Sequence, residues 1–253
     1  MTRKLRLFAL LLVFAAIAPA QADTPAFDRP GISFATTTVP IGGVALELGV
    51  PDFQRDTGAD GRSTFHGLSG IARIGIADQA EVQVGSALFN HSATKIDGVS
   101  ERHSGYGDTS LALKYALPSR VEAFTWAVLG GVTFPTGAKA FSAGTPQYDF
   151  GTTLKYDLNE TYSAVLYGNY TRLDGHNIYT VSPSVLFALT KTFGAFTEAG
   201  VSYVERGADS VVAGGGITWM PFSIVQLDLF ADFGVTSASP DVQAGFGVSI
   251  YFE

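Results

Sequence analysis

Apolar residues recur at every second position near the end of the chain. Between Val242 and Phe252 the even-numbered positions are all apolar, and the odd-numbered ones hold Gln, Gly, Gly, Ser and Tyr. The same alternation runs through residues 223–234, and no comparable run follows helical spacing. Because successive side chains of a β-strand point to opposite faces, this pattern predicts strands with one apolar and one mostly polar or small face.

The spacing of these segments predicts a closed barrel. Short connections at 77–79, 118–122, 159–161, 190–192 and 220–222 alternate with longer or more polar ones, notably at 51–62, 91–104 and 135–145. This alternation is typical of an up-and-down barrel with one short-turn end and one long-loop end. We therefore expect an all-β fold, a transmembrane antiparallel up-and-down β-barrel of about 12 strands over residues 41–253. The expected strands lie at 41–50, 64–76, 80–90, 105–117, 124–134, 146–158, 162–171, 177–189, 193–204, 209–219, 223–234 and 241–252.

Charged residues are confined to one phase of the alternation. If the apolar phase faces outward, no charged residue within the segments lies on it. An Arg or Lys on the lipid face costs ~2–4 kcal/mol at the middle of a bilayer, so a membrane barrel is expected to exclude charges there. The charges on the inward phase are Glu47, Arg73, Glu81, Asp108, Lys114, Asp149, Lys155, Asp157, Glu198, Asp228 and Asp232.

Aromatic residues on the outward phase gather near the strand ends. Membrane barrels place such rings in two girdles at the interfaces, whereas the core of a soluble sandwich, the alternative fold, favours large rings in mid-strand. Toward the short turns lie Tyr115, Phe124, Trp126, Tyr156, Tyr162, Phe187, Phe193, Trp219 and Phe252; toward the long loops lie Phe134, Tyr148, Phe150, Tyr170, Tyr179, Tyr203 and Phe233. One irregularity is Pro183, where we expect a bulge because proline cannot donate to the ladder.

The first 22 residues have the pattern of an export signal. A basic start, a short apolar run and the Ala20-Gln21-Ala22 motif predict a signal peptide that is cleaved after residue 22. The apolar run is much shorter than the ~20 residues of a membrane-spanning helix. We therefore expect export to a bacterial outer membrane. Residues 23–40 would then form a periplasmic segment or a plug inside the barrel.

Composition excludes several classes of function. The chain has a formal net charge of −7, the opposite sign to a typical nucleic-acid-binding protein, so no nucleic-acid partner is expected. The absence of cysteine removes disulfides, cysteine-bound zinc and thiol nucleophiles. No cluster with metal-ligand spacing is visible, and we expect no cofactor and no metal.

A short motif in the middle of the chain resembles a known family. The stretch Gly105-Tyr106-Gly107-Asp108, leading into Leu113-Lys114-Tyr115, is similar to the G-x-G-D…L-x-L-K-Y signature of bacterial outer-membrane β-barrels described as a meta-pathway phenol-degradation transporter family. Further similar features are Phe134-Pro135-Thr136-Gly137, Gln226-Leu227-Asp228-Leu229 and the closing strand, so the resemblance runs from about residue 65 to the end. It implies an outer-membrane barrel that passes small, often aromatic compounds. Outer-membrane barrels commonly end on an aromatic residue used by the assembly machinery, whereas this chain ends on Glu253.

The inward phase supplies the candidate site residues. Twelve strands are expected to enclose a narrow lumen, between the filled barrels of eight strands and the wide channels of sixteen. The lumen is either a conduit or a plugged structural interior whose charges pair with one another, and the rings either stack against aromatic solutes or only fill space. The lumen-lining candidates are Glu47, Arg73, Glu81, Asp108, Lys114, Asp149, Lys155, Glu198, Asp228, Asp232, Phe89, Tyr106, Tyr167, Phe196 and Phe230.

The expected function is passive passage of small organic solutes, aromatic or hydrophobic ones among them. The excess of inward acids favours neutral or cationic solutes over anions, and the loop 135–145 is a candidate gate. Besides the solute, the expected partners are outer-membrane lipid and the barrel assembly machinery. The alternatives are a structural or adhesive surface barrel and a lipid hydrolase built on the histidines, for example His91 beside Ser92; neighbouring positions do not establish a catalytic triad, so no catalytic residue is assigned.

Overall fold

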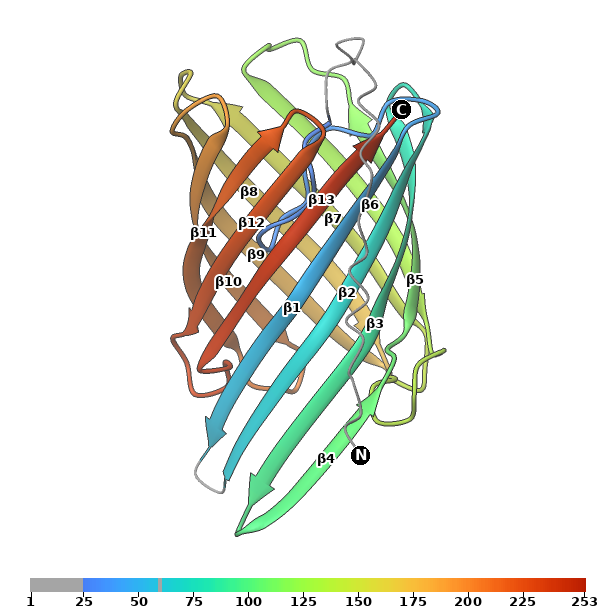
Figure 1. Ribbon diagram of the computed structural model, residues 1–253, viewed down its shortest axis with the longest axis vertical. Coiled ribbons are helices and arrows are strands. Elements are labelled where there is room, and N and C mark those ends of the chain that lie inside the picture. Colours follow the sequence, from blue (N-terminus) through green and yellow to red (C-terminus); the bar gives the residue numbers. More distant parts are fainter. Residues whose placement is uncertain (1–24, 59–60) are drawn as a thin grey trace, which may run out of the picture.

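The computed structural model describes residues 25–58 and 61–253 (Figure 1), so the expected signal peptide lies outside the described residues. All regular secondary structure in the described part is β. The strands are β1 (Val44–Gly58), β2 (Gly61–Ala77), β3 (Ala80–Ile96), β4 (Val99–Gly105), β5 (Thr109–Leu117), β6 (Phe124–Phe134), β7 (Gln147–Asp157), β8 (Tyr162–Leu173), β9 (His176–Ala188), β10 (Phe193–Val204), β11 (Ser210–Phe222), β12 (Val225–Gly234) and β13 (Val242–Phe252).

Antiparallel pairing between neighbours closes these strands into a barrel. β1 pairs with both β2 and β13, and Val44 lies opposite Phe252. β4 and β5 both pair with β3: β4 pairs with residues 90–96 and β5 with residues 80–86. Together they occupy the place of one strand in the barrel. The barrel is therefore 12-stranded and antiparallel, which confirms the expected fold.

The two ends of the barrel differ in the way the sequence predicts. The short-turn end carries the connections 78–79, 118–123, 158–161, 189–192 and 223–224, together with the end of β13. The long-loop end carries the connection 135–146 and the hairpins formed by β1–β2 and β3–β4. In Figure 1 these two hairpins reach well beyond the other strands at the bottom of the view.

Two of the long connections predicted from the sequence are wrong, because the β1–β2 and β3–β4 hairpins take their place. Residues 51–58, 61–62, 91–96 and 99–104 continue the strands instead, through the pairs Thr57 with Arg62 and Ile96 with Val99. β1 passes Val50–Pro51 through a one-residue bulge, so Asp52 returns to the inward face. Outside an apolar layer both faces of a strand can be polar, which is why the alternation that reveals the other strands is missing here.

The expected bulge at Pro183 is also wrong. Pairing of β9 with β8 and with β10 keeps one register on both sides of this residue. Partners are missing only on the β10 side, where Ala199 and Gly200 have none in β9. Each residue donates its backbone N–H to one neighbour only, so a proline removes one ladder bond and leaves the register unchanged.

The two faces of the wall differ sharply in polarity. Outward side chains are apolar and exposed, such as Leu229 at 51% and Ile217 at 49%, whereas Arg73 and Lys114 are fully buried inside. Aromatic pairs lie near both ends of the outer face, with Phe193 stacked on Trp219 toward the short turns, and with Tyr170, Tyr179 and Tyr203 toward the long loops. Among the described residues, no helix has the length and apolar character needed to cross a membrane.

Candidate functional site: the barrel lumen

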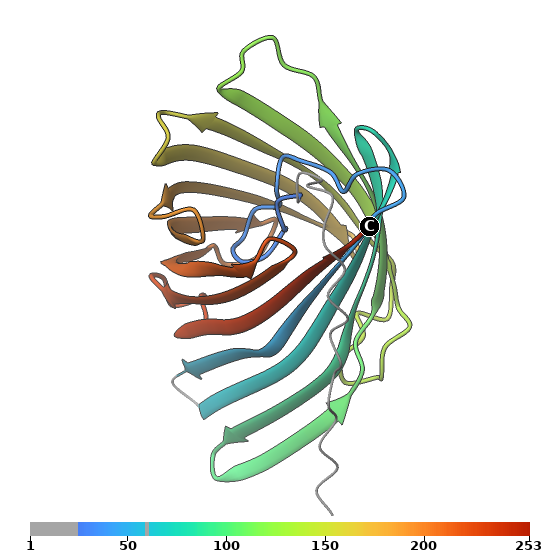
Figure 2. The same cartoon turned by 45° about the horizontal axis from the view of Figure 1, so that its top comes forward.

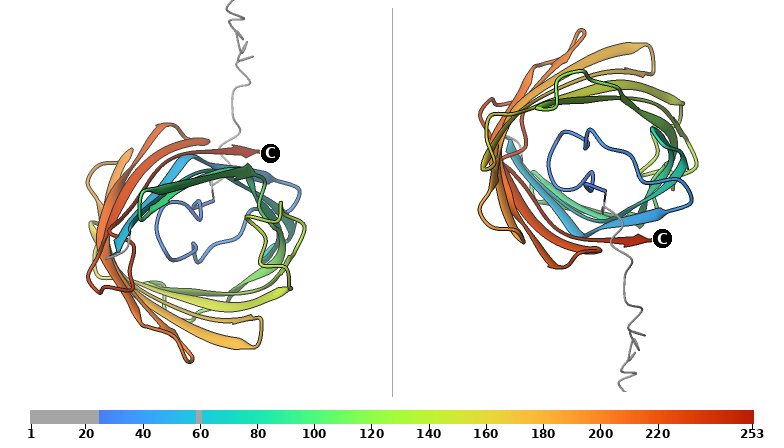
Figure 3. Two further views of the ribbon diagram at one scale, coloured as in Figure 1. Left: turned by 90° about the horizontal axis from the view of Figure 1, so that it is seen from below. Right: turned by 90° about the horizontal axis from the view of Figure 1, so that it is seen from above.

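The segment before β1 runs inside the barrel. Residues 25–43, which we call the inner segment, are the blue trace enclosed by the ring of strands in Figures 2 and 3. Near its end it turns beside β2, where Gly42 donates to the carbonyl of Gly75 and Gly75 to that of Gly43. A side chain on Gly75 would collide with the carbonyl of Pro40, so glycine is required for this close approach.

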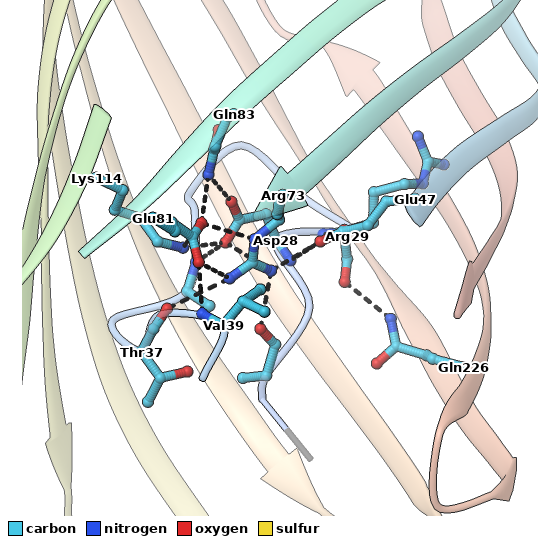
Figure 4. Close-up of polar contacts among 12 residues, drawn as sticks. Asp28, Arg29, Thr37, Val39, Glu47, Arg73, Glu81, Gln83, Lys114 and Gln226 are labelled. Carbon is cyan, nitrogen blue, oxygen red and sulfur yellow. Dashed lines mark hydrogen bonds and ion pairs between the residues drawn. The ribbon is translucent and has the colours of Figure 1, made fainter. Parts of the chain in front are cut away.

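A buried arginine organises one wall of the lumen. The guanidinium of Arg73 on β2 donates to Glu81 (Nε to Oε1, 2.8 Å) and to Glu47 (Nη1 to Oε1, 2.7 Å). All three side chains are fully buried, and they come from the adjacent strands β1, β2 and β3 (Figure 4). Strand pairing places Arg73 opposite Ala45 and Gln83, so its diagonal neighbours on both sides are the two glutamates.

The inner segment enters this network through Asp28. Its carboxylate lies 2.7 Å from the ammonium of Lys114 on β5, 3.4 Å from Arg73, and accepts a hydrogen bond of 2.7 Å from Gln83. Burial alone would raise the pKa of Asp28, but Lys114 and Arg73 hold it below its ordinary value. Breaking one partner out of such a buried network leaves an uncompensated charge, which typically costs about 3–5 kcal/mol.

Backbone groups of the inner segment bind the same glutamates. Glu47 accepts hydrogen bonds from the amides of Asp28 (2.9 Å) and Arg29 (2.7 Å), and Glu81 accepts one from Val39 (2.6 Å). Two charged residues of the wall thus fix both ends of the inner segment. The segment is therefore held by directional bonds as well as by packing.

Arg29 faces the opposite way from Asp28. Its guanidinium contacts Asp228 on β12 (3.3 Å) and Asp52 on β1 (3.4 Å), and lies 6.0 Å from the ring centre of Phe230. The Arg29 carbonyl also accepts a hydrogen bond from Gln226 (Figure 4). Two consecutive residues of opposite charge thus bind two parts of the wall that carry the complementary charge.

A cavity of about 570 Å³ lies between the inner segment and the strands β6 to β12. It is lined by aromatic rings, aliphatic side chains and hydroxyl groups. Among its lining residues are Phe34, Thr153, Lys155, Val165, Ser184, Phe196 and Glu198. The inner segment therefore packs most densely on β1, β2, β3 and β5 and leaves space along the other wall.

Other lumen candidates make contacts outside the Arg73 network. Asp149 accepts hydrogen bonds from Thr171 and Gln147, and Lys155 pairs with Asp157 at 2.8 Å. Tyr167 meets Phe34 of the inner segment edge to face, with ring centres 5.7 Å apart. Phe196, Glu198 and Asp232 are buried on the inward face of β10 and β12.

Two expected lumen rings are placed elsewhere. A bulge in the pairing between β2 and β3 shifts the phase of β3, so Asn90 is buried and Phe89 is 52% exposed. Tyr106 lies in the break between β4 and β5 and is 57% exposed. Strict alternation of inward and outward residues takes no account of this bulge and this break, so it assigns both rings to the wrong face.

Asp108 also differs from the expectation, because it binds a loop. Its carboxylate accepts hydrogen bonds from the amides of Gly137 (2.8 Å) and Ala143 (2.9 Å) in the connection 135–146. Burial would raise the pKa of Asp108, but these backbone donors lower it. The acid of the Gly105-Tyr106-Gly107-Asp108 motif thus fixes the loop that follows β6.

Sequence reasoning missed several residues that the lumen uses. Asp28 and Arg29 precede the first strand and carry no periodic signal, and Asp52 falls in the expected loop. Gln83 and Gln226 are neutral, so a search for charges passes over them. The only sequence feature that could have identified these two glutamines is their place on the inward positions of the alternating pattern.

The histidine expected beside Ser92 has a different partner. The ring nitrogen Nδ1 of His91 lies 2.8 Å from the hydroxyl of Ser104 across the β3–β4 hairpin, at an exposed position. No acid joins this pair among the hydrogen bonds of the described residues. Within the same residues, no group of three or more potential ligands is arranged to hold a metal ion.

Known structures share this barrel. An outer membrane channel from Pseudomonas putida F1 matches with a TM-score of 0.65 at 13% identity, covering 88% of this chain and 99% of that one. A KdgM porin in complex with disordered oligogalacturonate gives a TM-score of 0.53 at 9% identity (83% and 98% covered). The translocator domain of the autotransporter NalP from Neisseria meningitidis gives 0.52 at 10% (83% and 88% covered).

Comparison by sequence identifies the family. No curated protein matches the chain closely enough to count as a relative. A family model described as "Putative MetA-pathway of phenol degradation" matches residues 27–252, which is nearly all of the chain after the expected signal peptide. The match includes the inner segment as well as every strand. The chain therefore belongs to this family, as its Gly105-to-Tyr115 motif predicts.

Proposed function

We propose that this protein is an outer-membrane channel for the passive passage of small organic solutes. The observation that carries the proposal is the cavity of about 570 Å³ beside the inner segment, enclosed by a closed barrel. Pockets of roughly 300–1,000 Å³ are the size that small ligands fill. The mixture of rings and hydroxyls along the cavity suits compounds with an apolar body and a few polar groups.

The outer surface supports the location in a membrane. Exposed apolar residues cover the strands, and aromatic residues lie toward both ends. A soluble protein rarely exposes apolar patches of more than a few hundred Å², so this surface is explained by contact with lipid. With the short-turn end in the periplasm, the long hairpins would extend outward from the cell.

The lumen supports passage more than chemistry. The charges of the Arg73 network are engaged with one another or with the inner segment. None of the residues that line the cavity is a histidine or a cysteine. Selectivity would therefore arise from the width beside the inner segment and from the charges along it. The family's description refers to phenol degradation, which favours aromatic compounds as the solutes of this channel.

Reconstitution in planar bilayers tests the proposal. The folded mature chain is expected to give discrete openings in KCl, and liposomes that carry it are expected to swell in small neutral solutes such as benzyl alcohol. A barrel that folds, as shown by its shifted mobility in unheated gels, but neither conducts nor swells would refute the channel.

A further inference from the structure

Two glycines on β11 leave space in the wall of the lumen that side chains of β10 and β12 enter, and we call this region the trough. Gly214 lies between Glu198 of β10 and Asp232 of β12, and Gly216 lies between Phe196 and Phe230 on the same strands. A side chain on Gly214 would collide with Asp232, and one on Gly216 with the ring of Phe196. The Asp232 carboxylate and the Phe196 ring therefore lie over the two glycines. The two acids are about 10 Å apart at their Cα atoms, one strand on either side of Gly214.

Each of the two acids of this trough has a carboxylate oxygen without a hydrogen-bond donor. Glu198 is 6% exposed and Asp232 4% exposed. One oxygen of Glu198 accepts a hydrogen bond from the amide of Ile32 at 2.9 Å, and the other has no partner. Asp232 makes no hydrogen bond or ion pair with any residue in the described part of the chain, and its Oδ1 is fully enclosed. A buried carboxylate without a cation or donor is costly, which makes these oxygens a strong acceptor for a cation.

The next acid along β12 already holds a cation of the chain. Arg29 contacts Asp228 and lies over the ring of Phe230, two residues from Asp232. The same wall therefore binds an organic cation by a carboxylate and an aromatic face together. Rings and carboxylates are the groups that recognise ammonium ions attached to apolar bodies.

We propose that the trough formed by Phe196, Glu198, Phe230 and Asp232 is a binding site for organic ammonium ions. Its substrate class rests on the proposed channel function, because the site lies on the path that solutes would take. The ammonium group lies between Glu198 and Asp232 and its apolar body lies on the rings. Phe196 and Glu198 line the cavity, so a solute in the cavity contacts two of the four residues of the site.

Calorimetry with matched ligands tests the site without any mutation. The folded barrel in detergent at neutral pH is titrated with benzylammonium, benzyl alcohol and benzoate. Benzylammonium is expected to bind at least about ten-fold more tightly than benzyl alcohol, and benzoate more weakly than either. Equal affinity for the ammonium and the alcohol would overturn the proposal.

Isosteric variants then locate the binding. Glu198→Gln and Asp232→Asn are each expected to weaken benzylammonium at least about five-fold. The Gln retains an oxygen for Ile32, and removal of an unpaired buried charge does not threaten folding. Asp149→Asn is the matched control, since Asp149 is an inward acid on another wall with its own partners. An equal loss in the control and in the two variants would contradict the assignment.

A gain of affinity provides an independent check. Arg29→Gln removes the internal cation that competes for this wall, so benzylammonium is expected to bind about three-fold more tightly or better. Unchanged or weaker binding in this variant would argue against competition and against the site.

Conductance separates this proposal from the channel itself. A barrel that conducts KCl but shows no preference for benzylammonium in calorimetry would overturn the site and leave the channel standing. A silent barrel that still binds benzylammonium with the predicted response to Asp232→Asn would refute the channel and support the site.

Discussion

The carboxylate of Asp28 and the ammonium of Lys114, which are 86 residues apart in the chain, meet at 2.7 Å inside the barrel. This contact ties the inner segment to β5, and Arg73 extends it to β1, β2 and β3. It leaves the wall formed by β6 to β12 free to border the cavity. The width of the lumen therefore depends on whether the inner segment stays attached on one side.

Removal of the Asp28 carboxylate is expected to widen the conducting path. Asp28→Ala removes the partner of Lys114, Arg73 and Gln83 at once, so the inner segment should leave the wall more often. Single-channel conductance in planar bilayers should rise about two-fold or more. Asp209→Ala, a change of the same charge in the connection after β10, should leave the conductance unchanged. Equal conductance in both variants would show that Asp28 does not hold the segment.

Acid should release the same contact only at low pH. The pKa of Asp28 in the folded protein lies below its ordinary value of 3.8, so the stabilising charge is fully present above that value. It is lost as the pH falls through the lower folded pKa. The part of the conductance that depends on Asp28 should therefore not change above about pH 4, and should rise only with further acidification. A rise centred near neutral pH would point to another titrating group.

The Arg73 network should contribute strongly to stability. Arg73→Met leaves Glu47 and Glu81 buried without their principal cation, which should destabilise the barrel by about 3–5 kcal/mol. Denaturant unfolding, followed by the gel mobility of unheated samples, measures the change. Arg55→Met is the control, because Arg55 lies 3.8 Å from Asp241 at a position where 42% of its side chain is exposed. Such exposed pairs contribute about 0–1 kcal/mol, so a similar loss in both variants would contradict the network's role.

The outer face should tolerate charge only outside the bilayer. Leu229→Arg places a cation in the middle of β12 on the exposed apolar face, and should destabilise the folded barrel in lipid by ~2–4 kcal/mol. Val235→Arg adds the same charge to an exposed apolar residue in the connection after β12, and should cost ~0–1 kcal/mol. Refolding into vesicles under urea measures both. Equal costs would argue against the membrane position of β12.

The strands could be predicted from the sequence because each has one apolar and one polar face. Leu229 and Asp228, as neighbours on opposite faces, illustrate the signal, and twelve such segments specify the barrel. The method fails where both faces are polar. Asp52 and His91 therefore fell into expected loops, although both belong to strands that continue past the apolar region.

The lumen could be predicted only in part, because its contacts join distant segments. Inward phase selected Arg73, Glu81 and Lys114, but no pattern indicates that Asp28 reaches them from outside the strands. A bulge in β3 places Phe89 on the outward face. A break in strand pairing leaves Asp108 between β4 and β5, where it binds the loop after β6. A one-residue shift reverses every side chain beyond it, so phase alone cannot carry assignments across irregular pairing.

The most direct measurement of the solute path uses the absence of cysteine from the chain. A single Ser184→Cys places a thiol on the wall of the cavity, whereas Ser249→Cys places one at a fully buried inward position of β13 that does not line the cavity. A cationic methanethiosulfonate reagent is then added during bilayer recordings. We predict that it lowers the conductance of the Ser184→Cys channel and leaves the Ser249→Cys channel unchanged. Block at Ser249→Cys with no effect at Ser184→Cys would show that solutes do not pass beside the inner segment along β9.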